Sequence, residues 1–409
     1  MAANRNEATQ LGSKCGTRAR PAAGIEGYHG AGAKAVLALA LSGALSAAAF
    51  ADINVGITVS ATGPAAVLGI PERNTVEFCP TTIAGEKVNY IVLDDATNPG
   101  EATKNARKFV SENNVDIIIG SSTTPTALAV AEVANETKTP QLTMAPTPIV
   151  PDKEKWMFRL PQHNALMAKA LVDQMKRDGV KTLGFIGYAD SYGQSYLDEL
   201  QKVLEGSNIK LTVVERYNRT DTSVTGQALK VIAARPDAVL IVGSGTPAAL
   251  PQTTLVERGY KGRFYQTHGA VSRAFLQVGG KAVEGTIFPI GPIVVADQLP
   301  DSHPSKKVAL EYTRKYEAKY GKGSLSPFGA HMYDGCLVLQ QVAPVALKKA
   351  KPGTPEFRAA LRDALENSRE IVATHGVFNY SPDDHYGHDE RARVMIKIEN
   401  GDWKLINTQ

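Results

Sequence analysis

Residues 115–135 read VDIIIGSSTTPTALAVAEVAN, and this stretch decides the fold class. A largely apolar run at 115–119 ends at Gly120, hydroxyl residues follow, and an alanine-rich segment at 125–135 has helical spacing. A short apolar run without polar alternation is typical of a strand buried on both faces, and a helix after it is typical of a parallel sheet. The stretch therefore predicts one strand–helix unit of an α/β protein.

The same unit recurs on both sides of this stretch. Strands are predicted at 53–60 and 88–93, and a helix at 99–111, where Pro99 suits the first turn. Further strand–helix pairs are predicted at 182–187 with 192–204, at 210–215 with 222–234, and at 238–242 with 247–258. This alternation predicts parallel sheets that helices cover on both faces.

The pattern changes after residue 288. Long helices are predicted at 304–320, 328–349 and 354–367, followed by strands at 377–380, 393–398 and 403–406. Asn400-Gly401 is a typical hairpin turn between the last two strands. We therefore predict two Rossmann-like lobes joined by a hinge of several chain crossovers: residues 52–162 with 290–376, and residues 163–289 with 377–409.

The length and composition agree with this organisation. The 409 residues suit two domains of moderate size, and 43% hydrophobic with 21% charged residues is typical of a soluble globular protein. The net charge of +4 is small, and no basic stripe is interleaved with aromatics. We therefore expect no nucleic-acid partner.

The N-terminal region has the order of a secretory signal peptide. Lys34 precedes an apolar run at 35–48, and Ala49-Phe50-Ala51 follows it. The alternative is a membrane anchor, but ~14 apolar residues fall short of the roughly 20 that span a bilayer. We therefore expect residues 1–51 to be cleaved after Ala51 and the mature protein to reside in the periplasm.

The chain has three cysteines, of which Cys15 lies in the predicted leader. Cys79 and Cys336 fall in predicted helices of the mature part. An oxidising compartment would permit a bridge between them, and the alternative is two small buried thiols. Spacing leaves both open, and we expect free thiols.

Candidate binding residues follow the predicted strands. In open α/β sheets ligands bind beyond the carboxyl ends of the strands, and hydroxyl or small residues follow four of them, at 60–64, 120–125, 143–147 and 243–247. A hydroxyl beside a helix N-terminus suits an anion. Any one of these loops could be only a helix cap, but four in one chain favour a shared cleft for an anion.

Motifs for catalysis or tightly bound groups are absent from the sequence. It has no G-x-S-x-G elbow, H-E-x-x-H motif, P-loop or complete dinucleotide fingerprint. Asp383-Asp384-His385 with His388-Asp389 could be imagined as a metal site, but a solvated loop is the favoured interpretation. We therefore predict no catalytic residue, metal or cofactor.

Several of these features in order resemble the leucine/isoleucine/valine-binding family of type I periplasmic binding proteins, which serve ABC importers. They are the leader, the Gly63-Pro64 turn, Gly120 with its hydroxyls, the loop 143–147 and Asp190-Ser191-Tyr192-Gly193. The resemblance spans residues 52–409 and implies a periplasmic protein that captures a solute by hinged closure and presents it to an inner-membrane permease. It also implies a monomer.

The resemblance also implies individual ligand-binding positions. A family carboxylate-binding hydroxyl falls on Thr124, in the same loop as Ser122, and a backbone and hydroxyl pair falls on Ala145 and Thr147. A closing tyrosine falls on Tyr192. The pocket side chain at the Gly-Pro turn falls on Leu68.

Two departures from the family pattern bear on the ligand. Amino-acid binders place an acidic residue where this chain has Thr267-His268-Gly269, and a second aromatic lid position falls on Gly245. A buried ammonium without a partner would cost several kcal/mol. We therefore expect a small carboxylate without an ammonium group, such as an aromatic or aryl 2-oxo acid. His268 would then donate to an oxo or hydroxyl oxygen, and the alternative is a structural histidine on the rim. The small Gly245 would leave room for a ring.

Other functions remain open at this level. An amino-acid binder of the same family and a ligand sensor for a membrane receptor would share these features. An exported hydrolase would instead show turnover that depends on one serine.

Overall fold

The structure is a computed structural model that describes residues 52–407. The predicted signal peptide, its cleavage after Ala51 and Cys15 lie outside the described residues. Within the described range, no helix is both long and apolar enough to span a membrane.

The first sheet has the strand order β2-β3-β1-β4-β5-β6. Its strands are β1 (Ile53–Val59), β2 (Thr82–Ile83), β3 (Glu86–Asp94), β4 (Ile117–Ile119), β5 (Gln141–Thr143) and β6 (Met157–Arg159). All pairs are parallel except β2 with β3. Ile118 packs in one apolar cluster, and Ile117 and Ile119 pack in another, because successive side chains of a strand point to opposite faces. Both faces of β4 are therefore buried, as the apolar run predicts.

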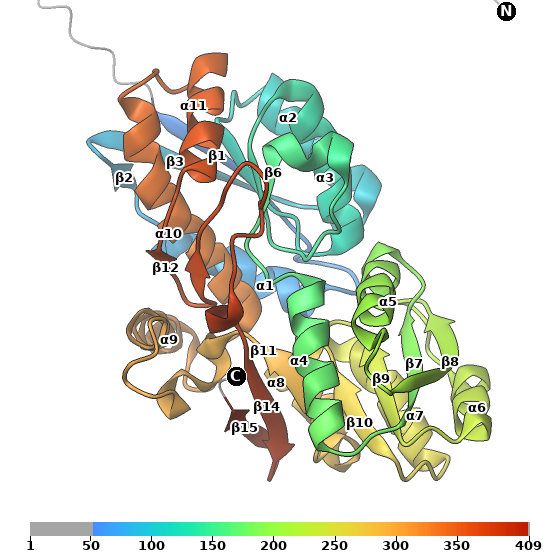
Figure 1. Cartoon of the computed structure of the whole chain (residues 1–409). Coiled ribbons are helices and arrows are strands. Elements are labelled where there is room, and N and C mark those ends of the chain that lie inside the picture. Colours follow the sequence, from blue (N-terminus) through green and yellow to red (C-terminus); the bar gives the residue numbers. More distant parts are fainter. Residues whose placement is uncertain (1–51, 408–409) are drawn as a thin grey trace, which may run out of the picture. The chain divides into compact units, whose positions relative to one another are not determined.

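Helices cover the two sides of this sheet (Figure 1). α2 (Pro99–Ser111) and α3 (Thr124–Thr137) pack together on one side, and α10 (Pro327–Leu347) and α11 (Pro355–Glu366) pack together on the other. α1 (Ala66–Thr75) packs against α10. The bounds of α2 are those predicted, because Asn98 caps its first turn by accepting from the N–H groups of Gly100 and Glu101.

The second sheet has the strand order β15-β14-β11-β10-β9-β7-β8. Its strands are β7 (Thr182–Tyr188), β8 (Lys210–Tyr217), β9 (Ala238–Val242), β10 (Arg263–Gln266), β11 (Ile287–Ile290), β14 (Val394–Glu399) and β15 (Asp402–Asn407). The first five are parallel, and β14 and β15 are antiparallel additions. Its helices are α4 (Asn164–Arg177), α5 (Ser191–Leu204), α6 (Thr225–Ala234), α7 (Ala249–Glu257), α8 (Arg273–Gly279) and α9 (Lys306–Tyr320). The predicted α/β class, with two mainly parallel sheets flanked by helices, is confirmed.

The chain passes between the two sheets more than once. It leaves the first sheet after β6, and after β11 the helices α10 and α11 pack on the first sheet again. A small hairpin of β12 (Ile371–Val372) and β13 (Val377–Phe378) follows before β14 returns to the second sheet. Side chains of α9 pack with those of β14 and β15. The exact residue bounds of the two lobes stay a prediction.

Cys79 and Cys336 form a disulfide, so the expectation of free thiols is wrong. Cys336 lies on α10, and Cys79 follows η1 (Val76–Phe78), the short continuation of α1. The packing of α1 against α10 places the two Cα atoms 5.5 Å apart, within disulfide range. A separation of 257 residues along the chain gives no hint of this contact.

The loop around residues 383–388 is only partly solvated, which corrects the prediction of a solvated loop. Asp383 and Asp384 are exposed, but His385 is buried and stacks on Phe158 with ring centroids 3.9 Å apart. Its Nδ1 lies 2.6 Å from the carbonyl oxygen of Glu154. His385 therefore serves the packing of this loop on β6.

Candidate functional site

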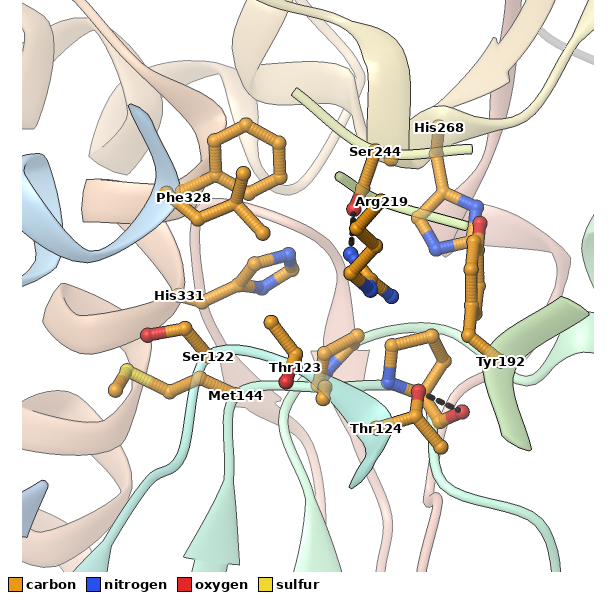
Figure 2. Close-up of a pocket in the computed structure, with 15 residues that line it drawn as sticks. Ser122, Thr123, Thr124, Met144, Tyr192, Arg219, Ser244, His268, Phe328 and His331 are labelled. Carbon is orange, nitrogen blue, oxygen red and sulfur yellow. Dashed lines mark hydrogen bonds between the residues drawn. The ribbon is translucent and has the colours of Figure 1, made fainter. Parts of the chain in front are cut away.

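A cavity lies where the carboxyl ends of strands from both sheets meet (Figure 2). The loops after β4, β5 and β6 line it from the first sheet, and the loops after β7, β8, β9 and β10 line it from the second. Helices α1 and α10 add side chains. The lining residues are Leu68, Ser122, Thr123, Thr124, Met144, Ala145, Pro146, Pro161, Tyr192, Arg219, Ser244, His268, Gly269, Phe328 and His331.

Most of the residues predicted for the site line this cavity. They are Leu68, Ser122, Thr124, Ala145, Tyr192 and His268. Residues that are distant in sequence meet here because parallel strands of one sheet end at the same edge.

Thr147 is not among the lining residues. Its side chain is fully buried, and its hydroxyl accepts from Nε of Arg159 at 3.0 Å. Arg159 is itself buried and paired with Glu154. In this structure Thr147 therefore supports the loop after β5 and does not face the cavity.

Gly245 also does not line the cavity, although its neighbour Ser244 does. Its φ of 63° is in the left-handed region, and an added Cβ would lie 2.6 Å from a methyl carbon of Val67. Glycine is needed here because the backbone turns tightly and approaches α1 closely. This close approach, and not room for a ligand ring, explains the small residue.

On the first-sheet side, the N-terminus of α3 faces the cavity. Thr123 is the N-cap, and its hydroxyl lies 2.7 Å from that of Thr126. Thr124 is the first helical residue, and its hydroxyl donates to the carbonyl oxygen of Pro146 at 3.4 Å. Pro125 has no N–H group and the capping box engages the N–H groups of Thr123 and Thr126, so the positive end of the helix dipole is what makes this wall suited to an anion.

On the second-sheet side, Tyr192 and Arg219 face the cavity. The Tyr192 hydroxyl donates to Oγ1 of Thr267 at 2.8 Å, and burial raises the pKa of Tyr192, so that it stays neutral. Asp190 caps α5 with one oxygen, which accepts from the N–H groups of Tyr192 and Gly193.

Arg219 was not predicted from the sequence. Nε donates to Oδ2 of Asp190 at 2.7 Å, Nη1 donates to Oγ of Ser244 at 2.6 Å, and the guanidinium lies 4.1 Å from the ring centroid of Tyr188. Its side chain is only 13% exposed, and Figure 2 shows the guanidinium in the middle of the cavity. The available sequence signal was its position directly after a strand, where parallel-sheet proteins bind ligands.

Two histidines in the cavity wall are neutral. Burial lowers the pKa of His268 to about 4. Burial, with repulsion from His375, lowers the pKa of His331 well below its usual range. Both ring nitrogens of His268 and Nδ1 of His331 have no hydrogen-bond partner among the described residues. Buried polar atoms of this kind are costly unless a ligand or water satisfies them.

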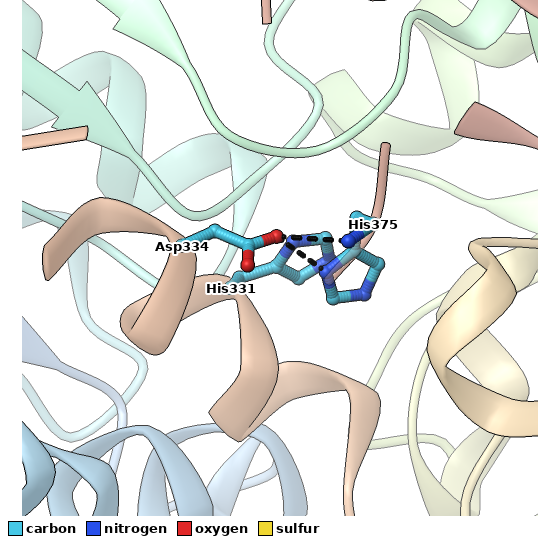
Figure 3. Close-up of side chains that lie close together, drawn as sticks. All are labelled: His331, Asp334 and His375. Atoms are coloured by element: carbon cyan, nitrogen blue, oxygen red, sulfur yellow. Dashed lines mark hydrogen bonds and ion pairs between the residues drawn. The ribbon is translucent and has the colours of Figure 1, made fainter. Parts of the chain in front are cut away.

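His331 belongs to a buried cluster with Asp334 and His375 (Figure 3). Asp334 accepts from the N–H groups of Thr374 and His375, and its Oδ2 lies 2.9 Å from Nδ1 of His375. The rings of His331 and His375 stack at 3.7 Å between centroids and 14° between planes. The ring nitrogens of two stacked imidazoles direct their lone pairs within two nearly parallel planes. These lone pairs therefore do not converge on one ion, as those of metal ligands must. The cluster instead fixes the orientation of His331 in the cavity wall.

The comparison with known families agrees with this architecture. The family described as periplasmic binding protein matches residues 52–396. The chain belongs to the periplasmic binding protein family.

Several known proteins and solved structures are similar to this periplasmic binding protein. Leu/Ile/Val-binding protein homolog 2 of Brucella abortus is 26% identical over 261 residues, which cover 61% of this chain and 69% of that protein. A solved extracellular ligand-binding receptor from Rhodopseudomonas palustris HaA2 is 48% identical, with a TM-score of 0.86 and coverage of 87% of this chain and all of the other. LivJ from Streptococcus pneumoniae, solved with isoleucine, is 16% identical with a TM-score of 0.74 over 87% of this chain and all of its own, which shows the shared fold.

This chain therefore belongs to the group of periplasmic binding proteins, and its fold is the predicted type I fold. Members of the group are periplasmic, bind small ligands and work with ABC permeases. They bind solutes and are not enzymes, which argues against the alternative of an exported hydrolase.

Proposed function

We propose that this protein captures a small carboxylate without an ammonium group, such as an aromatic acid or aryl 2-oxo acid, for an ABC importer. The observation that carries the proposal is the charge of the cavity. Among the described residues 52–407, its lining contains one arginine, Arg219, and no aspartate or glutamate. A buried cation attracts an anion and repels an ammonium group.

The carboxylates close to the cavity already have partners within the protein. Asp190 uses one oxygen for the N-terminus of α5 and the other for Arg219. Glu72 is fully buried behind Ser122. An amino acid would therefore bring its ammonium beside a guanidinium without a free carboxylate partner, at a cost of several kcal/mol.

Residues from both sheets would contact the ligand, each set at a different group. The carboxylate would lie between the α3 N-terminus, with Thr124 and the backbone at Ala145, and Arg219. Leu68, Met144 and Phe328 supply apolar contacts for a ring. The neutral His268 would donate to an oxo or hydroxyl oxygen, which satisfies one of its two unpartnered ring nitrogens. Because ligand contacts both sheets, it would favour the closed arrangement that a permease recognises.

Replacing Thr124 with alanine should weaken carboxylate affinity by about 5- to 150-fold, because one hydrogen bond to a charged group is worth roughly 1–3 kcal/mol. Isothermal titration calorimetry with phenylpyruvate measures this. Thr137→Ala, at the other end of α3, is the matched control and should bind like the wild type. Equal affinities of the two variants would exclude Thr124 as a carboxylate ligand.

Replacing His268 with glutamate should shift preference from phenylpyruvate toward phenylalanine by at least tenfold. The new carboxylate would pair with an ammonium and repel an oxo oxygen. The measurement is the ratio of the two dissociation constants in wild type and variant. A ratio that does not change contradicts the placement of His268 beside the 2-oxo group.

The second candidate is an amino-acid binder, which the names of the relatives favour. A thermal-shift screen of the wild type with leucine, phenylalanine, benzoate and phenylpyruvate separates the two. Stabilisation by the amino acids alone would refute the proposal. Size-exclusion chromatography with and without ligand tests the expected monomer.

A further inference from the structure

Glu72 is a buried acid directly behind the cavity wall. It lies on α1 and is fully buried, and its Oε2 is hydrogen-bonded to the hydroxyl of Ser122. Its other oxygen, Oε1, has no partner among the described residues, and no lysine or arginine forms an ion pair with it in the same range. An ionised carboxylate in such surroundings is strongly disfavoured.

Asp95 is the neighbouring acid; it is equally buried, and burial raises its pKa too, but it has more hydrogen-bond donors around it. It accepts from the hydroxyls of Thr58, Ser60 and Ser121 and from the N–H group of Thr97. Four donors stabilise the charged form of a carboxyl group. Of the two acids, Asp95 is therefore suited to hold the charge and Glu72 to hold a proton.

Other titratable groups lie on the elements that pack against α1. They are His331, Tyr333 and Asp334 on α10, Glu77 on η1, and Arg73 on α1 itself. Asp334 is held by His375, and Glu77 by Lys319 at the surface. His331 is neutral. Asp95 is therefore the charge that acts on Glu72, and its repulsion adds to burial in raising the pKa of Glu72 well above its usual range.

Ser122 connects Glu72 to the ligand cavity. Its Oγ already accepts from the N–H group of Ser60 at 2.8 Å, so one lone pair and one hydrogen remain. If Glu72 is ionised, the Ser122 hydroxyl must donate to it, and a lone pair is left for the cavity. If Glu72 is protonated, it donates to Ser122, and the hydroxyl hydrogen is free to point into the cavity.

We propose that Glu72 is a positioning residue that, as a neutral acid, directs the Ser122 hydroxyl toward the bound carboxylate. Capture of the anion is then coupled to one proton on Glu72. The inference rests on the proposed function in that a carboxylate occupies the α3 end of the cavity. Below the pKa of Glu72 the affinity is independent of pH. Above it, binding takes up a proton, and the affinity falls by up to about tenfold per pH unit.

The test is calorimetry with phenylpyruvate between pH 6 and 9.5, in two buffers of different ionisation enthalpy. The wild type should take up an increasing fraction of one proton on binding as the pH rises. Absence of uptake up to pH 9.5 would overturn the coupling. This measurement on the wild type does not depend on the folding of any variant.

Variants distinguish a role of Glu72 in positioning Ser122 from a role in packing alone. Glu72→Ala should lose about tenfold in affinity, as should Ser122→Ala. Glu72→Gln should restore affinity at pH 6, because its amide also donates to Ser122, and should show no proton uptake. A Glu72→Gln protein that binds as weakly as Glu72→Ala, or still takes up protons, contradicts the proposal. If leucine binds the wild type and phenylpyruvate does not, the proposed function fails, and the same series with leucine still tests Glu72.

Discussion

Replacing Arg219 with alanine is expected to weaken binding of phenylpyruvate by about 100- to 1000-fold. The guanidinium is the single cation in the cavity lining, and its loss leaves both the ligand carboxylate and Asp190 without compensation. Truncating one partner of a buried, hydrogen-bonded charge pair costs roughly 2–5 kcal/mol, and a 100- to 1000-fold loss corresponds to about 3–4 kcal/mol. Isothermal titration calorimetry at constant pH and salt measures the change.

Arg216→Ala is the matched control for charge. Arg216 lies on β8, three residues before Arg219, but its guanidinium donates to Gln194 and does not line the cavity. It should bind within about threefold of the wild type, as expected of a partly exposed charge. Arg219→Lys should recover only part of the affinity, because an ammonium cannot reproduce the fork of donors to Asp190 and Ser244. Equal loss in the Arg216 and Arg219 variants would show a general charge effect instead of a ligand contact.

Removing the Cys79–Cys336 disulfide is expected to lower the free energy of unfolding by about 2–5 kcal/mol. The bridge closes a loop of 257 residues, so it strongly restricts the unfolded chain. For a protein of this size, with an unfolding entropy of about 2.1 cal/mol/K per residue, we expect Tm to fall by about 3–7 °C. Differential scanning calorimetry of the wild type with and without reductant, beside the Cys79→Ala/Cys336→Ala variant, measures it.

The double variant is its own control, because reductant should not change its Tm. Both sulfur positions are buried, and alanine fills them without introducing a polar atom. Ligand affinity should change little, since neither cysteine lines the cavity. A wild type whose Tm is the same with and without reductant would contradict a stabilising role for the bridge.

Local sequence patterns were sufficient for the elements and for much of the site. The apolar run before Gly120 and the alanine-rich segment after it form β4 and α3, and Asn400-Gly401 forms the hairpin of β14 and β15, with positive φ at both residues. Thr124 and Tyr192 face the cavity because each lies in the first turn of a helix that follows a strand of a parallel sheet. These features depend on a few neighbouring residues, whose preferences for helix, strand or turn can be read from the sequence.

The tertiary structure alone decided which side chains meet. Thr147 has the expected place after β5, but buried Arg159 engages its hydroxyl away from the cavity. Arg219 enters the cavity because Asp190 and Ser244, from two other strand ends, hold its guanidinium. The disulfide depends in the same way on the packing of α1 against α10. Strand and helix formation follows from short-range propensity and periodicity, whereas contacts across hundreds of residues depend on how the sheets pair and pack, which no local pattern encodes.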